Sequence, residues 1–427
     1  MASKLLIPSV VAIGALLAVI TPFLRESNAI FNVLHDFSKY TPHLTQLNAT
    51  CSHQHPTLLT GCEDMQLVGD SIYTACLTDF RNRNKYWPHY SRQPRPWSGD
   101  KLFRWDLPTD TVVELSLQNY PYPATAEHRS FHGIDVNVLP NGDVSIYAVN
   151  HLRNESVIDK FVHTPGTAFA THVLRIPTDA EGAARLPNAI FALPEKDGEA
   201  AMFVTNDHYY DDGWMRMVEE AGRRPWAWVS YYSTSTGWKK VLSNMRGANG
   251  ITGEKEVQNR RVYVSEIMGG AIRVLEPTAA EGELREIQRV KVDMLGDNIG
   301  RFGDDLYITG PAKGMAVDHF QAEPEAAKDG PGMVVKRINT KQLGGGFFGG
   351  GYTADPIVET LIVDGGLVAN MTTTSVFRPY PVEAPVAGEG EGEGEDEMEE
   401  KPLGKPKGDL FITGLQHRGI MKCTNFE

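Results

Sequence analysis

The sequence lacks the signatures of several common classes of protein. It has no stripe of Lys and Arg that would neutralise phosphates, and its formal net charge of −13 argues against a nucleic-acid partner. No cluster of Cys and His has the spacing of a zinc site. No Gly-x-Ser-x-Gly segment is present, so a serine nucleophile on a strand-to-helix turn is not supported. The glycine-rich segment Gly344–Gly351 has no Lys-Ser/Thr pair and no following helix, which argues against a phosphate-binding loop.

Long apolar runs are also absent, except at the N-terminus. Residues 5–24 are apolar, and about 20 such residues can cross a bilayer core. We therefore expect residues 1–29 to be either a cleaved signal peptide, with Ser27-Asn28-Ala29 as the cleavage site, or a retained membrane anchor. Residues 30–50 are expected to form a helical or linker segment, since residues 28–38 carry apolar side chains at helical spacing. Both interpretations place the rest of the chain in the secretory pathway, either extracellular or facing the lumen.

Cysteine is scarce, and the four present are Cys51, Cys62, Cys76 and Cys423. Four cysteines allow three complete pairings. The sequence leaves Cys62 and Cys76 equally compatible with a disulfide and with buried free thiols. A bridge between Cys51 and Cys423 would close a very long loop, which stabilises a fold by roughly 4–5 kcal/mol in the entropy model. Three sequons, which begin at Asn48, Asn154 and Asn370, predict glycosylation.

A weak repeat runs along the chain. Each copy has a Gly-Asp pair beside a short apolar or alternating stretch, at Gly69-Asp70, Gly142-Asp143, Gly303-Asp304 and Gly408-Asp409. A Gly-Asp turn followed by a strand indicates a hairpin, and hairpins repeated every several tens of residues are typical of propellers and solenoids. A propeller blade with its loops needs roughly 40–60 residues. Residues 51–427, without the acidic segment described next, would supply about six blades of an all-β fold.

Two segments interrupt the strand pattern. Residues 379–407 are rich in Pro, Glu and Gly, and residues 389–400 contain eight carboxylates. Such a block is expected to stay solvated, as a disordered surface insertion. Residues 214–221 are amphipathic and predict a short helix.

Several of the predicted strands carry neighbouring oxygen-bearing side chains at one end. Adjacent strand residues point to opposite faces, so each pair offers one ligand to each side, although any single pair is also typical of an ordinary turn. If the strand ends converge on one axis, one all-oxygen set suits Ca²⁺; it comprises Glu63, Asn206, Asn249, Asp297 and Asn298. Asp64 and Asp207, which face the other way, would hold a second, structural ion.

Two histidines flank the turn at residues 142–143. A hairpin there would bring His132 and His151 together. Taken singly, each histidine is typical of a hydrogen-bonded turn residue. As a pair beside a cation that binds water, a neutral imidazole is a suitable general base near pH 7.

These segments resemble motifs of the serum paraoxonase/arylesterase family, in the same order along the chain. They are Gly61-Cys-Glu-Asp64, Phe131-His-Gly-Ile134, Val149-Asn-His151, Thr205-Asn-Asp-His-Tyr209, Ala248-Asn-Gly-Ile251 and Asp297-Asn-Ile299. The closing segment from Gly414 to Cys423 is also similar to the end of that family. The resemblance covers about residues 51–423, and Thr205–Tyr209 is its most specific motif.

The resemblance implies a six-bladed β-propeller whose central tunnel holds two Ca²⁺ ions, with an N-terminal hydrophobic helix. It implies a carboxylic ester hydrolase that acts on small hydrophobic lactones and aryl esters, with weak phosphotriester turnover. By position, it assigns the five-residue oxygen set to a catalytic calcium. It assigns Asp64, Asp207 and the backbone carbonyl of Ile134 to a structural calcium. It further implies a dyad of His132 and His151, an end-to-end disulfide of Cys51 and Cys423, and a leader that often stays as an anchor.

Some features depart from the family pattern and leave alternatives open. Cys62 beside Glu63, together with Cys76, makes an additional disulfide near the metal conceivable, and the acidic insertion is foreign to the family. One alternative is a non-catalytic, secreted calcium-binding propeller module. Another is a propeller enzyme of the sugar-lactonase or strictosidine-synthase kind. The sequence does not choose the natural substrate.

Overall fold

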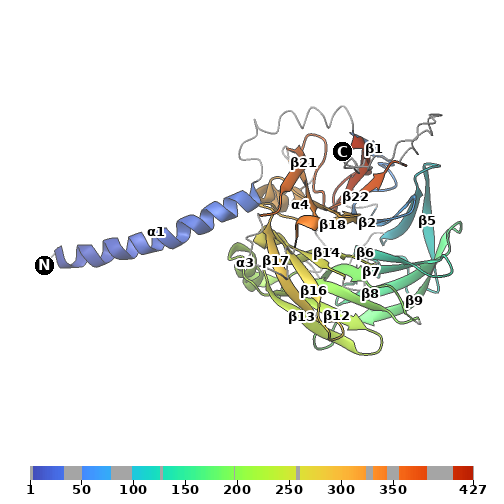
Figure 1. Cartoon of the computed structure of the whole chain (residues 1–427), viewed down its shortest axis with the longest axis horizontal. Helices are drawn as coiled ribbons and strands as arrows, with labels where there is room; N and C mark the ends of the chain where they lie inside the picture. The colour runs from blue at the N-terminus through green and yellow to red at the C-terminus, as the bar shows by residue number, and fades with distance from the viewer. Residues whose placement is uncertain are drawn as a thin grey trace, which may run out of the picture.

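Strands dominate the chain beyond residue 50, and the fold is all-β as predicted (Figure 1). The acidic block and the sequon at Asn48 lie outside the described residues. The computed structural model describes residues 3–32, 51–77, 99–125, 128–196, 198–255, 260–323, 330–343, 355–381 and 407–426.

The strands form antiparallel meanders of four. One sheet holds β10 (Pro187–Ala192), β11 (Ala201–Asn206), β12 (Ala227–Ser233) and β13 (Gly237–Met245). The next holds β14 (Ala248–Gly253), β15 (Val262–Glu266), β16 (Ala271–Pro277) and β17 (Leu284–Lys291). A third holds β18 (Ile299–Phe302), β19 (Asp305–Gly310), β20 (Met333–Asn339) and β21 (Val358–Asp364).

The largest sheet has eight strands and consists of two meanders. The first meander is β2 (Cys62–Val68), β3 (Ser71–Cys76), β4 (Lys101–Asp106) and β5 (Thr111–Gln118). The second is β6 (Phe131–Val138), β7 (Val144–His151), β8 (Ser156–His163) and β9 (Phe169–Pro177). A short parallel pairing of β5 with β9 joins them.

The last sheet combines the two ends of the strand region. It holds β22 (Thr374–Pro379), β23 (Gly408–Thr413), β24 (Ile420–Phe426) and, at its edge, β1 (Cys51–Gln54). Cys51 lies opposite Cys423 in the register of β1 and β24, and the two form a disulfide with Cα atoms 4.0 Å apart. The first strand of the region is thus fixed covalently to the last.

The first strands of the meanders contact one another in sequence. β2 contacts β6, and the contacts continue through β10, β14, β18 and β22 back to β2. The arrangement is therefore propeller-like, with these first strands as a closed inner ring.

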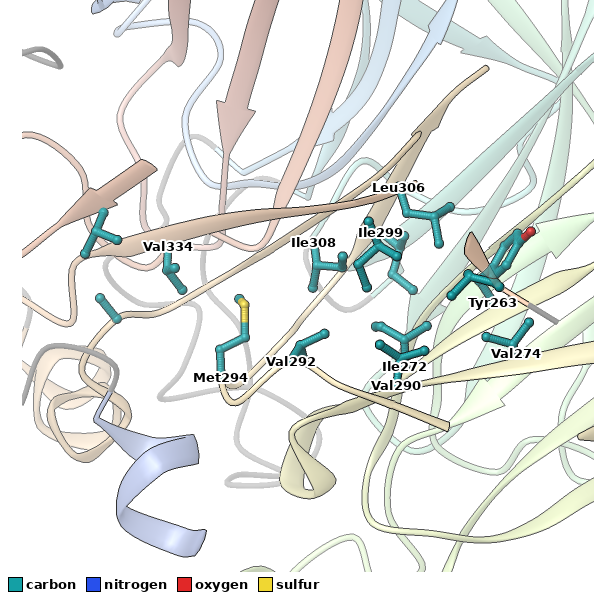
Figure 2. Close-up of a cluster of buried hydrophobic side chains, with 14 residues drawn as sticks. Tyr263, Ile272, Val274, Val290, Val292, Met294, Ile299, Leu306, Ile308 and Val334 are labelled. Atoms are coloured by element: carbon teal, nitrogen blue, oxygen red, sulfur yellow. The ribbon is translucent and has the colours of Figure 1, made fainter. Parts of the chain in front are cut away.

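Apolar side chains fill the space between neighbouring meanders. Figure 2 shows the cluster between the β14–β17 and β18–β21 sheets, where Ile272 and Val290 of one sheet lie beside Ile299 and Leu306 of the next. Each fully buried Val, Leu or Ile stabilises the fold by roughly 1.5–3 kcal/mol. Equivalent clusters between the other neighbours hold the ring together.

Three of the four predicted Gly-Asp turns connect first and second strands. Gly69, Gly142 and Gly303 have φ of 55°, 86° and 55°, a conformation that glycine adopts without steric cost. The prediction for Gly408-Asp409 was wrong. Gly408 begins β23 and pairs with Pro379, so the acidic segment connects β22 and β23 in place of a tight turn.

The N-terminal helix α1 (Ser3–Phe31) projects from the body of sheets (Figure 1) and runs without a break through residues 27–29. Its last turns dock on the body. Ile30 is buried against Gly270, and the Arg223 guanidinium lies 3.4 Å from the Glu26 carboxylate. No helix in the described part of the chain is sufficiently long and apolar to span a bilayer.

The other helical segments are short. The predicted helix at residues 214–221 is confirmed as α3 (Gly213–Ala221). Among the described residues, the remaining helical segments are η4 (Ile267–Gly269), η5 (Gly314–Ala316), α4 (Val317–Ala322) and η6 (Thr340–Gln342).

Candidate functional site

The predicted site residues gather at one end of the inner ring. Glu63, His132 and Asn249 are each the second residue of a first strand, and Asp297-Asn298 directly precede β18. Asn206 ends the second strand β11, where it lies opposite Pro187 at the beginning of β10. Because paired strands run antiparallel, the end of a second strand lies beside the beginning of its first strand. Residues from distant parts of the sequence therefore converge.

Two glycines allow the first strands to approach closely at this end. A Cβ atom on Gly133 would lie 2.3 Å from the carbonyl oxygen of Asn188. A Cβ atom on Gly250 would lie 2.5 Å from the Cα of Asn298. Glycine is therefore required immediately after His132 and after Asn249, which explains the His-Gly and Asn-Gly pairs of the sequence.

Glu63 links three of the first strands. Its Oε1 accepts a hydrogen bond of 2.7 Å from Nδ2 of Asn298, and its Oε2 lies 3.8 Å from Nδ1 of His132. The hydroxyl of Thr373 donates to its backbone carbonyl. The carboxylate is 1% exposed, so its charge is almost completely removed from water.

Asp297 is the centre of the negative charge at this end. Burial raises its pKa well above the usual value, the charges of Asp64 and Asp207 raise the pKa further, and a hydrogen bond with the Asn249 side chain opposes the rise. Oδ1 of Asn249 is buried and has no hydrogen-bond partner among the described residues. Carboxylates whose charges repel one another, beside a buried amide oxygen without a partner among the described residues, favour a cation.

Asn206 is completely buried, and both polar atoms of its side-chain amide form hydrogen bonds. Oδ1 accepts a hydrogen bond of 2.7 Å from the N–H of Leu186, and Nδ2 donates to the carbonyl of His208 at 2.6 Å. An amide oxygen has two lone pairs, so Oδ1 keeps one for a ligand. These two bonds fix its orientation.

The residues predicted to hold the structural calcium, which are Asp64, Asp207 and the carbonyl of Ile134, each contact other protein groups. Oδ1 of Asp64 accepts from the N–H of Met65 and Oδ2 from the N–H of Ile134, at 2.8 and 3.0 Å. Burial raises the pKa of Asp64 to about 7 although these bonds lower it. The Ile134 carbonyl, the predicted ligand, accepts from the Gln66 side chain at 3.1 Å. Oδ2 of Asp207 lies 3.0 Å from a nitrogen of His208.

The two predicted histidines lie together. The ring centroids of His132 and His151 are 5.3 Å apart, and both side chains are buried. Nδ2 of Asn188 donates to Nε2 of His132 at 3.2 Å, which leaves the imidazole proton on Nδ1, towards Glu63. Nδ1 of His151 forms a bond of 2.9 Å with the hydroxyl of Ser156.

The sequence did not single out four residues that support this site. Asn188 and Ser156 hold the histidines, while Thr373 and Thr374 bond to Glu63 and to Asp64. No pattern marks Asn188, because a lone Asn after Pro is typical of a turn. For Thr373, its place just before a first strand, like that of Asp297-Asn298, was a usable signal.

The candidate ligand atoms are of the type that a hard cation prefers. It contains carboxylate and carboxamide oxygens, the ligands that Ca²⁺ takes in a flexible shell of six to eight. Within the described residues, no group of three or more His, Cys, Asp or Glu side chains is suited to hold a metal ion. A calcium site here therefore depends on the amide oxygens of the Asn residues.

The remaining sequence predictions concern covalent features. Cys62 and Cys76 form a second disulfide between β2 and β3, next to Glu63, so the described chain has no free thiol. Asn154 is exposed in the turn between His151 and Ser156. Asn370 is half-buried, and its amide bonds to the backbone of Gly332 and Gly366.

Aromatic side chains of α3 and β12 lie in different surroundings. Trp214 is 72% exposed on α3, whereas Tyr231 lies in the core between two sheets. Tyr232 packs against Trp238 on the other side of the same sheet. Alternation along β12 separates Tyr231 from Tyr232.

Comparisons with known proteins agree with the motifs. The family model described as Arylesterase matches residues 100–342. Serum paraoxonase/arylesterase 1 of Mus musculus is 26% identical over 326 residues, which are 75% of this chain and 81% of that protein. Serum paraoxonase/arylesterase 2 of Canis lupus familiaris is 29% identical over 170 residues, 39% of this chain and 44% of that protein. A solved luciferin-regenerating enzyme aligns over 87% of this chain and 94% of its own, with 9% identity and a TM-score of 0.45.

Proposed function

The chain belongs to the arylesterase family, and we propose that it is a calcium-dependent hydrolase of lactones and aryl esters. The observation that carries the proposal is the convergence of Glu63, Asn298 and His132, which are distant in sequence, within hydrogen-bond or ion-pair distance. The same end of the ring holds Asn249 with its unsatisfied oxygen. An oxygen set beside a histidine pair suits ester hydrolysis.

The proposal includes a six-bladed propeller with two calcium ions on its axis. The ring of contacts through β2, β6, β10, β14, β18 and β22 supports six blades. The outer ion would be held by Glu63, Asn206, Asn249, Asp297 and Asn298. The inner ion would be held by Asp64, Asp207 and the carbonyl of Ile134, which would add a cation to its bond with Gln66.

The chain's own groups account for proton transfer. His132 would accept the proton of the attacking water on Nε2 once that water takes the place of the Asn188 amide there, and the Nδ1 proton, directed to Glu63, favours the resulting imidazolium. Asn188 orients the ring, and His151 lies behind it, held by Ser156. Calcium, when bound, supplies Lewis-acid polarisation of the ester carbonyl.

We further propose that the protein works in the secretory pathway. The two disulfides are consistent with an oxidising compartment. Asn154 is the sequon suited to a glycan, because it is exposed while the amide of Asn370 is engaged. Residues 5–24 would associate with a membrane if the leader is retained.

Hydrolysis of phenyl acetate and of a panel of γ- and δ-lactones by the purified full chain tests the proposal. We expect turnover that is lost with a calcium chelator and restored by added Ca²⁺. Turnover that a chelator leaves unchanged would contradict the calcium dependence. Calcium binding without turnover of any ester or lactone would assign the protein to a non-catalytic module instead.

A further inference from the structure

Four of the first strands carry the same irregularity at the end where the site residues gather. In β2, β6, β10 and β14, the register with the second strand shifts by one residue between the first and fourth positions of the strand. The second and third residues therefore face a single partner residue, which is the arrangement of a β-bulge. Bulges re-aim side chains and are frequent beside active sites. The second residues of these strands are Glu63, His132, Asn188 and Asn249.

Asn188 is the member of this set that the predicted site does not include. Of the other three, two are predicted ligands of the outer ion and one is the predicted base. Asn188 holds the equivalent position in β10. It follows Pro187, which lies opposite the predicted ligand Asn206 in the register of β10 and β11. The fold therefore places Asn188 next to a ligand of its own meander.

Side-chain contacts also connect Asn188 to the oxygen set. Its Nδ2 lies 3.2 Å from Nε2 of His132, and Nδ1 of that ring lies 3.8 Å from Oε2 of Glu63. Oε1 of Glu63 accepts a hydrogen bond from Asn298. The backbones of β6 and β10 meet at the same place, because a Cβ atom on Gly133 would lie 2.3 Å from the carbonyl oxygen of Asn188. A continuous chain of contacts thus runs from Asn188 to Asn298.

The side-chain oxygen of Asn188 is buried without a partner. The residue is 6% exposed, and its Oδ1 has no hydrogen-bond partner among the described residues. Oδ1 of Asn249, at the same position of β14, is in the same condition. A buried acceptor without a partner carries the cost of its desolvation, and a bound ion is one explanation for such a group. Two bulges therefore each present an unsatisfied carboxamide oxygen at the candidate site.

A further neutral oxygen suits the outer ion. The predicted set supplies five residues, whereas Ca²⁺ takes six to eight oxygens, carboxamide oxygens among them. Glu63 and Asp297 already match the charge of one divalent ion. An amide adds a ligand without adding charge.

We propose that Oδ1 of Asn188 is a sixth protein ligand of the outer calcium ion, supplied by β10. The inference rests on the calcium site of the proposed function and adds a ligand that the family resemblance does not assign. It also gives the four bulges a common role, since each turns the second residue of a first strand towards the site.

Calcium binding to the purified full chain tests this assignment. Asn188→Ala removes the oxygen, whereas Asn188→Asp keeps an oxygen at the same place. Asn137→Ala is the matched control, because Asn137 is also buried and also joins β6 to the chain of β10, through a bond of 2.8 Å to the carbonyl of Leu193. It lies five residues beyond His132 in β6, away from the candidate site. Calorimetric titration with Ca²⁺ gives the affinities, and circular dichroism checks the fold of each variant.

Terbium luminescence provides a second readout, which does not depend on the charge of the side chain. Decay rates in H₂O and in D₂O count the water molecules bound to Tb³⁺ in the calcium sites. Water fills a coordination position from which a protein ligand has been removed. Asn188→Ala should therefore bind one more water per chain than the wild type, whereas Asn188→Asp and Asn137→Ala should not.

Asn188→Ala should weaken the binding of one calcium ion at least about tenfold, because that ion loses a ligand. Asn188→Asp should bind calcium at least as tightly as the wild type, and Asn137→Ala should keep the affinity of the wild type. If Asn188→Ala does not fold, Asn188→Leu, which has nearly the same shape, takes its place.

An Asn188→Ala protein with the calcium affinity and the bound water of the wild type overturns this inference alone. The same holds for an Asn188→Asp protein that gains a water. A wild type that binds no calcium overturns the proposed function as well.

Discussion

Removal of the disulfide between Cys62 and Cys76 should weaken both the fold and the calcium site. The bridge joins two residues that are 14 apart in sequence and that lie opposite each other in the register of β2 and β3. A loop of about this length corresponds to roughly 3 kcal/mol in the entropy model. Cys62 immediately precedes Glu63. Removal of the bridge therefore also loosens the end of β2 that carries the Glu63 and Asp64 carboxylates.

The assay is urea unfolding of Cys62→Ala/Cys76→Ala, in chelator and in saturating Ca²⁺. In chelator, the free energy of unfolding should fall by about 3 kcal/mol. In calcium the loss should be larger, by about 1.4 kcal/mol for each tenfold loss of affinity, because a bound ion stabilises only the folded state.

The other disulfide provides the control. Cys51→Ala/Cys423→Ala opens a bridge of sequence separation 372, at the edge strand β1. It should cost about 4–5 kcal/mol in chelator, with the same added stability from calcium as the wild type. The reasoning fails if both pairs of substitutions leave the calcium-dependent increment unchanged.

Four further outcomes are expected. His132→Gln should lower lactone turnover by roughly 10²–10³-fold at unchanged calcium content, since only the base is lost; near-wild-type turnover would remove His132 from the mechanism. Glu63→Gln should lower calcium affinity in equilibrium dialysis at least about tenfold, because a buried carboxylate ligand becomes neutral, and unchanged affinity would contradict the ligand set. In secreted protein, Asn154→Gln should reduce the mass by one glycan while Asn370→Gln does not, and a mass loss of one glycan in Asn370→Gln by mass spectrometry would contradict this. Burial lowers the pKa of His417 to about 3, whereas its pKa in the unfolded chain is about 6.5. The unfolded chain therefore binds a proton that the folded chain does not, and the free energy of unfolding falls as the pH decreases from about 6.5 towards 3. His417→Gln removes this proton uptake and should make acid unfolding less steep, and identical acid curves would contradict this.

The sequence predicted the architecture more completely than it predicted the contacts between individual side chains. The Gly-Asp turns at Gly69, Gly142 and Gly303 carry a local backbone signal, so hairpins were recoverable from the chain alone. At Gly408 the same dipeptide begins a strand, because the acidic segment takes the place of the turn. A Gly-Asp dipeptide carries only a local preference for a turn, and the surrounding chain determines whether a turn forms there.

The sequence marked candidate ligands where oxygen-bearing residues stand side by side, and it did not mark single supporting residues such as Asn188. Asn206-Asp207 and Asp297-Asn298 stood out because such pairs recur along the chain, each beside an apolar, strand-like run. Asn188 reaches His132 only because β6 and β10 meet at Gly133, and that meeting depends on the whole ring. Likewise, Asp135 of β6 pairs with Lys255, which follows β14 on the other side of β10, and no spacing in the sequence encodes this contact.

A crystal structure of the full chain grown with Ca²⁺ tests the central claim most directly. The account predicts an ion with oxygens of Glu63, Asn206, Asn249, Asp297 and Asn298 at about 2.3–2.6 Å. It also predicts a second ion beside Asp64. Electron density that shows no ion among these oxygens, or that places calcium only on the outer surface, would contradict it.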